Sequence, residues 1–356
     1  MMKRFLTFFL ILVTTLGLLA ACGGQQDTTE PGLTGIAKQA VDSGNIQYYF
    51  MNSDGASVGY EKYTTYWGDS CLIAFPDGKL MLIDTGIQNF YPILKARLTE
   101  LGVSTIDYMV FSHPHNDHAG GAWKGLFDDF TIKHVYHSGA LNLGWSEKAR
   151  IGVICEKYNV PCTEWNAGDT MEFGLAENPV KMRVLWPTPE AIAQLQPIDT
   201  DPAINSLSLV MRFDYGEHSS LFTGDIYQNL QQQTMEVQVP DWPGTEETLV
   251  SMYQNGELDV DLLKLPHHGN PSTSNSVGFL SAVSPKYAVA TSYAPVGNYL
   301  STYKKRGLTA SVLFDRMHGY ISFQASADGK LTPKIERTDY LPDFGKDWNE
   351  SEKIKK

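Results

Sequence analysis

The sequence predicts an α/β fold in which β-sheets are covered by helices. Short apolar runs typical of strands alternate along the chain with segments whose apolar residues recur at helical spacing. Such alternation favours sheets packed with helices over an all-β sandwich. The hydrophobic fraction of 42% is ample for a large core, and no internal repeat of solenoid length is visible.

The predicted strands are short apolar runs bounded by turn residues. They are Ile46–Phe50, Ser70–Phe75, Leu80–Ile83, Ile106–Phe111, Lys181–Leu185, Ser206–Phe213, Ser219–Thr223, Asp261–Leu265 and Tyr287–Thr291. The run Pro76-Asp77-Gly78 predicts a tight turn between the second and third strands. Helices are predicted at Gln88–Leu101, where Gly102 follows as a stop signal, and at Ser146–Tyr158.

The N-terminus predicts an exported, lipid-anchored protein. Lys3 and Arg4 precede an apolar stretch that is short for a membrane span, and the run Leu19-Ala20-Ala21-Cys22 follows it. This run resembles a bacterial lipobox, which implies cleavage before Cys22 and acylation of its thiol. We therefore expect an extracytoplasmic lipoprotein whose membrane contact is the lipid at Cys22.

Composition divides the chain into four predicted parts. Residues 1–21 are the signal peptide, 22–44 a polar, flexible tether, 45–338 a single folded domain and 339–356 a polar tail. The formal net charge is −12, and loss of Lys3 and Arg4 with the signal peptide makes it −14. Because affinity for duplex nucleic acid comes mainly from Lys and Arg contacts to phosphates, this charge argues against a duplex partner.

A cluster of metal-binding residue types follows the predicted strand that ends at Phe111. The run Ser112–Gly121 contains His113, His115, Asp117 and His118. Imidazole and carboxylate groups suit zinc and neighbouring divalent metals, and a turn after a strand can aim several side chains at one point. The sequence therefore predicts a metal site here.

This run resembles the HxHxDH signature of the metallo-β-lactamase superfamily residue for residue. The resemblance implies a four-layer αββα sandwich with two metal positions, His113 and His115 holding the first ion and Asp117 and His118 the second. It also implies that the run Leu82–Gly86 corresponds to a strand ending in D-T-G. Asp84 is then expected to orient the ligand loop.

Two later strand ends extend the resemblance. Gly224-Asp225 resembles the point at which the family places a carboxylate shared by two metals, which fixes their separation. The run Pro266-His267-His268-Gly269 resembles the strand end that supplies the last histidine of the second position. His268 is favoured over His267 for that role, and both remain candidates.

Lys264 is predicted to face the opposite way from its neighbours Leu263 and Leu265, because side chains alternate along a strand. Its ammonium group either stabilises a developing anion during catalysis or reaches solvent at the strand edge. The sequence favours neither alternative.

The later motifs are similar to the subgroup that contains the hydrolase domain of the DNA-uptake channel ComEC/Rec2, over roughly Gly59 to Phe323. The sequence departs from better-known superfamily members at one position. Asn205 and Ser206 stand where many members have a histidine for the first metal. Because a neutral amide is a weaker ligand, we expect the first metal position to bind more loosely than the second.

The resemblance implies a hydrolase with one or two Zn²⁺ ions per chain, Mn²⁺ being the alternative metal. Coordination lowers the pKa of water to about 7, and Asp117 is expected to orient or deprotonate this nucleophile. A phosphodiester (a nucleic acid, a nucleotide or a head group) is the favoured substrate, and a carboxylic ester or lactam is the alternative. A non-enzymatic, metal-containing surface protein is the second alternative.

Three further features leave alternatives open. The aromatic residues Tyr60, Tyr63, Tyr66 and Trp67 either stack on a substrate or pack within strands. Cys71 is expected to be a buried strand residue, whereas Cys155 and Cys162 are close enough to form a disulfide but need not do so. For the remaining histidines, His134, His137, His218 and His318, an exposed or core position without chemistry is favoured, and the alternative for His137 is a position at the mouth of the site.

Overall fold

The computed structural model describes residues 33–51, 68–139, 150–198, 200–228, 242–291 and 296–337. All of them belong to one compact unit that begins at Leu33. The predicted signal peptide with Cys22, the aromatic residues from Tyr60 to Trp67 and the predicted C-terminal tail lie outside the described residues. In the described part of the chain, no helix combines the length and apolar character needed to cross a membrane.

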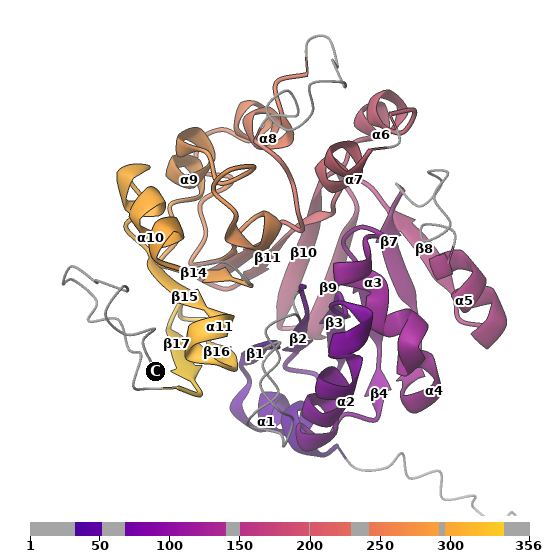
Figure 1. Ribbon diagram of the computed structural model, residues 1–356. Coiled ribbons are helices and arrows are strands. Elements are labelled where there is room, and N and C mark those ends of the chain that lie inside the picture. Colours follow the sequence, from indigo (N-terminus) through magenta and orange to yellow (C-terminus); the bar gives the residue numbers. More distant parts are fainter. Residues whose placement is uncertain are drawn as a thin grey trace, which may run out of the picture. The chain divides into compact units, whose positions relative to one another are not determined.

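Two β-sheets form the centre of this unit (Figure 1). The first has the strand order β17-β16-β1-β2-β3-β5-β7-β8. Its strands are β1 (Ile46–Phe50), β2 (Cys71–Ala74), β3 (Leu80–Ile83), β5 (Tyr108–Phe111), β7 (Val135–Ser138), β8 (Cys162–Trp165), β16 (Ile321–Ala325) and β17 (Leu331–Ile335).

The second sheet has the order β15-β14-β13-β12-β11-β10-β9. Its strands are β9 (Thr170–Leu175), β10 (Asn178–Trp186), β11 (Val210–Tyr215), β12 (His218–Phe222), β13 (Leu262–Lys264), β14 (Tyr287–Ala290) and β15 (Ser311–Phe314). The short strands β4 (Thr105–Ile106) and β6 (Thr131–Ile132) pair with each other.

Helices cover the outer face of each sheet (Figure 1). Those of the first half are α1 (Gly35–Ser43), α2 (Tyr91–Glu100), α3 (Asn116–Gly121), α4 (Phe127–Asp129) and α5 (Arg150–Tyr158). Those of the second half are α6 (Pro189–Leu195), α7 (Asp201–Ser206), α8 (Thr245–Met252), α9 (Val277–Val283), α10 (Val296–Lys305) and α11 (Asp315–His318).

Alternate side chains of each strand enter different cores. Leu72 and Leu82 pack against the helices of the first half, whereas Ile73 and Ile83 pack between the two sheets. The same alternation holds in the second sheet, where Leu263 faces helices and Leu262 faces the other sheet. Sheets buried on both faces require strands that are continuous apolar runs. The layers are therefore helix, sheet, sheet, helix, which confirms the predicted four-layer α/β sandwich.

The structure corrects the predicted tether. Residues 35–43 form α1, although the sequence analysis predicts a flexible segment as far as Gly44. Ile36, Ala37 and Ala40 share one face of this helix and are buried in the core of the first half. Gly44 then ends the helix with a φ of 63°. The overall polarity of the segment concealed this short apolar face.

Two predicted strands also have different bounds. The strand predicted from Ser206 begins at Val210, because residues 201–206 form α7 with Pro202 in its first turn. The run Ile106–Phe111 is divided at Asp107, whose carboxylate accepts a hydrogen bond from the backbone N–H of Leu80 at 2.9 Å. The residues before Asp107 pair with β6, whereas those after it pair with β3 and β7.

The cysteines and the other histidines have partners outside the group of predicted ligands. Cys71 is buried, as predicted, whereas Cys155 and Cys162 are free thiols that hydrogen-bond to each other. His218 is buried between Tyr48 and Asp261. The remaining three contact local partners: His134 bonds Thr163, His137 the carbonyl of Ser138, and His318 the backbone of Phe314.

Candidate metal centre

The predicted ligands lie where parallel strands end. Strands β3 and β5 are parallel neighbours in the first sheet, and β12, β13 and β14 are parallel neighbours in the second. The carboxyl ends of parallel strands meet at one edge of a sheet, so the residues that follow them converge. Asp84, His113–His118, Asp225 and His267–His268 occupy these positions.

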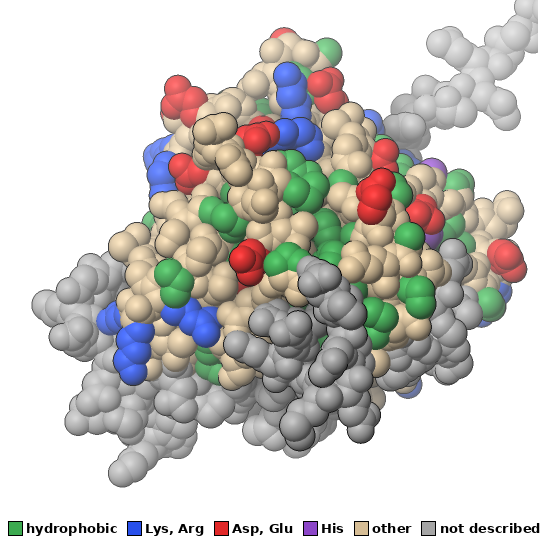
Figure 2. Space-filling view, turned by 90° about the horizontal axis from the view of Figure 1, so that it is seen from above, with side chains coloured by type: hydrophobic (Ala, Val, Ile, Leu, Met, Phe, Trp, Pro, Cys, Tyr) green, Lys and Arg blue, Asp and Glu red, His purple; other side chains and the backbone are tan. Residues whose placement is uncertain are grey.

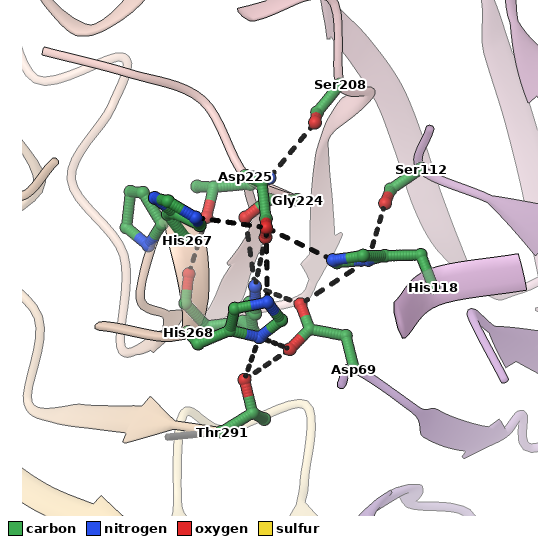
Figure 3. Close-up of polar contacts among 12 residues, drawn as sticks. Asp69, Ser112, His118, Ser208, Gly224, Asp225, His267, His268 and Thr291 are labelled. Atoms are coloured by element: carbon green, nitrogen blue, oxygen red, sulfur yellow. Dashed lines mark hydrogen bonds and ion pairs between the residues drawn. The ribbon is translucent and has the colours of Figure 1, made fainter. Parts of the chain in front are cut away.

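Asp225 lies at the centre of the site, between His118 and His267 (Figure 3). Its Oδ2 atom is 3.2 Å from Nε2 of His118 and 3.2 Å from Nε2 of His268. Nε2 of His268 is also 3.1 Å from Oδ2 of Asp117. The residues predicted for the second metal position are therefore linked through His268, which contacts both Asp117 and Asp225.

His113 and His115, the residues predicted for the first metal position, lie next to each other. Nε2 of His113 and Nδ1 of His115 are 3.1 Å apart, and the ring of His113 packs 4.0 Å from the ring of His118. Burial, followed by the proximity of His118 and His115, holds the pKa of His113 well below its usual value. A neutral imidazole is the form that binds a metal.

In His118 and His268, the ring nitrogen that faces away from Asp225 contacts a second carboxylate. Nδ1 of His118 is 2.8 Å from Oδ2 of Asp84, and Nδ1 of His268 is 3.0 Å from Oδ1 of Asp69. Asp84 also accepts hydrogen bonds from the backbone N–H and the hydroxyl of Ser112 at 2.8 and 2.7 Å. Such contacts fix the ring orientation and the tautomer, so the predicted role of Asp84 agrees with its contacts.

Asp69 is a site residue that the sequence analysis missed. Its carboxylate lies with His118, Asp225 and His268 in a group whose ligand atoms are all within 4.8 Å of one another. However, Asp69 contacts Nδ1 of His268, on the side of the ring that faces away from Asp225. We therefore assign Asp69 to the orientation of His268. The sequence feature that could have indicated this residue is the pair Gly68-Asp69, which directly precedes an apolar strand.

Gly68 explains how Asp69 reaches the site. Its φ of 119° favours glycine, and a Cβ at this position would lie 2.0 Å from the carbonyl oxygen of Asp117. The backbone N–H of Asp69 donates to that same carbonyl at 3.1 Å. The start of β2 therefore packs directly beneath the ligand loop.

Lys264 is buried on the inner side of the site, which excludes the solvent-exposed alternative. Its ammonium group forms an ion pair with Asp69, donates to the carbonyl of Gly224 at 2.9 Å and lies 3.6 Å from Oδ1 of Asp225. Its side chain faces away from Leu263 and Leu265, as predicted from strand alternation. These contacts commit the ammonium group to holding Asp69 and Asp225, whereas the sequence analysis considered a role in catalysis.

The donor set fits a divalent metal. Nε2 of His118 and Oδ1 of Asp225 are buried and make no hydrogen bond within the described part of the chain. Burial would lower the pKa of His118, but the carboxylates of Asp225 and Asp84 raise it to about 10. The site thus stabilises a positive charge between these groups. Imidazole nitrogens and carboxylate oxygens are the ligands of zinc and its neighbours.

Comparison with known families supports this assignment. Residues 67–178, which include the ligand loop, match the model of the metallo-beta-lactamase superfamily. This part of the chain is similar to the metallo-β-lactamase superfamily. The chain has a metal-dependent hydrolase fold, with a candidate metal site that includes Asp69, His118, Asp225 and His268.

The chain is also similar to the competence protein ComA of Neisseria gonorrhoeae, with 30% identity over 232 residues. The match covers 65% of this chain and 25% of that protein, so the chain spans about a quarter of its relative's length.

Two solved structures are more distant. The metallo-β-lactamase-fold protein YhfI from Bacillus subtilis is 12% identical with a TM-score of 0.45, over 82% of this chain and all of that one. Tm1679, described as a metal-dependent hydrolase of the β-lactamase superfamily, is 13% identical with a TM-score of 0.45, over 76% and 95%.

Asn205 is the residue at which the sequence analysis expects a departure from the family pattern, and the structure shows its contacts. Asn205 is buried at the end of α7, and its Nδ2 donates to the hydroxyl of Tyr227 at 3.3 Å. The Tyr227 ring packs 4.9 Å from the ring of His267. Asn205 therefore contacts Tyr227, and its Oδ1 has no hydrogen-bond partner among the described residues.

Replacing Asp84 by asparagine is expected to weaken metal binding by the domain by about 10- to 100-fold. The amide oxygen can still accept from the backbone of Ser112, but the NH₂ group then faces Nδ1 of His118. This favours the tautomer with hydrogen on Nε2, which cannot bind a metal. Asparagine tolerates the φ of 59° at this position. Competitive zinc titration tests this, and unchanged affinity would refute the orienting role.

The loop that carries His267 and His268 is held from below by Glu246. Its two carboxylate oxygens accept hydrogen bonds from the backbone N–H groups of Asn275 and Ser276 at 2.5 and 2.7 Å. Arg306 donates to the carbonyls of Pro271 and Ser274 in the same loop. Burial raises the pKa of Glu246 from 4.5 to about 7, against the opposing effect of these N–H groups.

This pKa predicts a pH-dependent stability. Because the folded protein binds the proton of Glu246 more tightly than the unfolded chain does, the free energy of unfolding falls as the pH rises from about 4.5 to about 7. The loss should be about 3 kcal/mol relative to Glu246→Gln. Urea unfolding with chelator at both ends of this range measures it. Glu247→Gln, at the exposed neighbouring position, should retain the wild-type profile.

Proposed function

We propose that this chain is an extracytoplasmic, zinc-dependent phosphodiesterase anchored to the membrane by a lipid on Cys22. The observation that carries the reaction class is the set of nitrogen donors arranged around one carboxylate, Asp225. A carboxylate placed in this way can be shared by two metals, and two-metal sites suit the in-line displacement of phosphodiesters. When bound, the metals supply Lewis acidity and lower the pKa of water.

The residues of the chain have separate roles in this proposal. Asp117 is the most exposed carboxylate of the site, at 24% for its side chain, so it can contact both the nucleophilic water and a substrate. Asp84 and Asp69 hold His118 and His268 in position. Lys264 offsets part of the negative charge of Asp69 and Asp225.

The charge of the surface favours a small or single-stranded substrate over a duplex. The net charge is −12, and on the face shown in Figure 2 the Lys and Arg side chains lie in separate groups, with Asp and Glu between them. Duplex binding relies on a continuous basic surface. A nucleotide, a single strand or a head-group phosphodiester fits the proposal better.

Turnover of chromogenic substrates tests the reaction class. Zinc-loaded protein is expected to hydrolyse bis(4-nitrophenyl) phosphate faster than 4-nitrophenyl acetate or a chromogenic cephalosporin, and chelator should abolish the activity. Faster ester or cephalosporin hydrolysis would replace the phosphodiester by the carboxylic alternative. No turnover of any of them, despite bound metal, would favour a non-enzymatic surface protein.

The lipid anchor has its own test. Cys22→Ala is expected to leave an uncleaved or released precursor, because neither acylation nor lipoprotein processing can occur without the thiol. Membrane fractionation and the mass of the N-terminal fragment measure this. A mature-size variant that still partitions completely into detergent would refute the anchor.

A further inference from the structure

Two cysteines outside the candidate metal site lie on the same side of the first sheet. Cys155 belongs to α5 and is buried in the core between the sheet and its helices, together with Val135 of β7. Cys162 is the first residue of β8 and is the partner of Val135 in the parallel ladder. Because paired residues of a ladder share a face, the thiol of Cys162 points to the side on which Cys155 lies. The two thiols form a hydrogen bond with each other.

A tight connection between α5 and β8 maintains this contact. The backbone N–H of Val160 donates to the carbonyl of Cys155 at 2.9 Å, just beyond the end of the helix. Asn159 has a φ of 52°, a left-handed conformation that asparagine tolerates. The chain therefore reverses within a few residues and returns Cys162 to the last turn of α5.

His137 completes this group of side chains. It follows Val135 by two residues on β7, so its ring lies on the same face of the sheet as Cys162, to which it is hydrogen-bonded. Its Nδ1 donates to the carbonyl of Ser138 at 2.7 Å, which holds the ring in place. Cys162 is exposed, whereas Cys155 is buried. Solvent therefore has access to one sulfur of the pair.

These three groups have the charges of an activated thiol. The hydrogen bond with Cys155 lowers the pKa of Cys162, burial would raise it, and His137 lowers it further, to about 5. The hydrogen bond with Cys162, followed by burial, raises the pKa of Cys155. Burial would lower the pKa of His137, but Cys162 and the carbonyl of Ser138 raise it. Cys162 is therefore a thiolate at neutral pH, and the thiolate is the nucleophilic form of cysteine.

We propose that Cys162 is a reactive cysteine that peroxides oxidise, and that Cys155 is the second thiol, which converts it to a disulfide. In the first step the sulfur of Cys162 attacks a peroxide oxygen. An S–O bond forms, the O–O bond breaks, and the leaving oxygen takes a proton from His137. In the second step the sulfur of Cys155 attacks the sulfenic sulfur, an S–S bond forms, and the hydroxyl group leaves as water with the proton of Cys155. Both thiols are oxidised, and the peroxide is reduced to water and an alcohol, or to water alone if it is hydrogen peroxide.

Differential alkylation tests this on the full-length protein in detergent. Reduced protein is treated with hydrogen peroxide and unfolded, the remaining thiols are blocked with iodoacetamide, and the peptides are identified by mass spectrometry. We expect a disulfide between Cys155 and Cys162 that dithiothreitol reverses. Cys71, which is buried between the sheets, should stay a free thiol and serves as the internal control. Sulfinic acid at Cys162 without a disulfide, or equal oxidation of Cys71, would overturn the inference.

The alkylation rate of the folded protein is a second readout. At about pH 6, Cys162 should react with iodoacetamide about tenfold faster in the folded than in the urea-unfolded wild type, because its larger thiolate fraction outweighs the lower nucleophilicity of an acidic thiolate. Equal rates in the two states would contradict the proposal.

Variants separate the roles of the two partners. His137→Asn should shift the pH profile of Cys162 alkylation to higher pH. His134→Asn is the matched control and should shift it less, because the His134 ring stacks on Tyr136, on the other face of β7. Cys155→Ser should leave Cys162 as a sulfenic acid that dimedone traps, with no disulfide. Thermal melting checks that each variant folds, and the two wild-type measurements decide the inference without them.

Discussion

Asp225→Asn is expected to remove bound metal and to lower kcat/KM for the phosphodiester by about 10³-fold or more. Oδ2 of Asp225 is the atom on which Nε2 of His118, His267 and His268 converge. The substitution removes a negative charge and offers an amide in its place. If the amide oxygen faces the site, it is a poorer metal ligand than a carboxylate oxygen. If the NH₂ group faces the site, its hydrogens repel a metal ion and the N–H groups of the histidines.

The side chain of asparagine has nearly the same shape, so the fold should persist. Elemental analysis and competitive titration measure the metal, and chelator-treated wild type provides the reference. Asp42→Asn is a suitable control, because Asp42 is 60% exposed and pairs only with Lys38 on its own helix. If Asp225→Asn retained two tightly bound ions, the shared carboxylate would be wrong, and with it the site as described.

Much of this site could be predicted from the sequence because it consists of contiguous runs at strand ends. His113–His118, Asp225 and His267–His268 each follow an apolar strand, and parallel strands bring their carboxyl ends to one edge. The residue types then indicate a metal. This reasoning uses local order alone, so it predicted which residues converge. It favoured His268 over His267 for the second metal position, and the contacts of His268 with Asp117 and Asp225 agree with that choice.

The sequence analysis did not predict the role of Asp69, the helix α1 or the burial of Lys264. Asp69 precedes β2 and reaches the site only because Gly68 allows its backbone to lie against that of Asp117. Helix α1 was missed because only three apolar residues, Ile36, Ala37 and Ala40, carry its packing within a polar segment. For Lys264, alternation gave the direction of the side chain, but only the second sheet's packing shows that it is enclosed.

Lys264→Met is expected to destabilise the metal-free protein by about 3–5 kcal/mol. The substitution leaves the buried carboxylate of Asp69 and the carbonyl of Gly224 without the ammonium group that each contacts. Lys264 stays charged across the working pH range: burial would lower its pKa, but Asp69 and then Asp225 raise it. Burial would raise the pKa of Asp69, but the ammonium group of Lys264 and then His268 lower it to about 2. Removing one partner therefore leaves an uncompensated charge in the core.

The double variant Lys264→Met with Asp69→Asn separates this cost from the loss of packing. It should recover part of the stability, because the unpaired charge is gone and the asparagine can still accept from Thr291. Urea unfolding with chelator measures all three proteins. Lys38→Met is the matched control, since this lysine is 58% exposed and its ion pair with Asp42 should contribute less than about 1 kcal/mol. A Lys264→Met variant as stable as this control would show that the carboxylates of the site do not need a buried cation when the metal is absent.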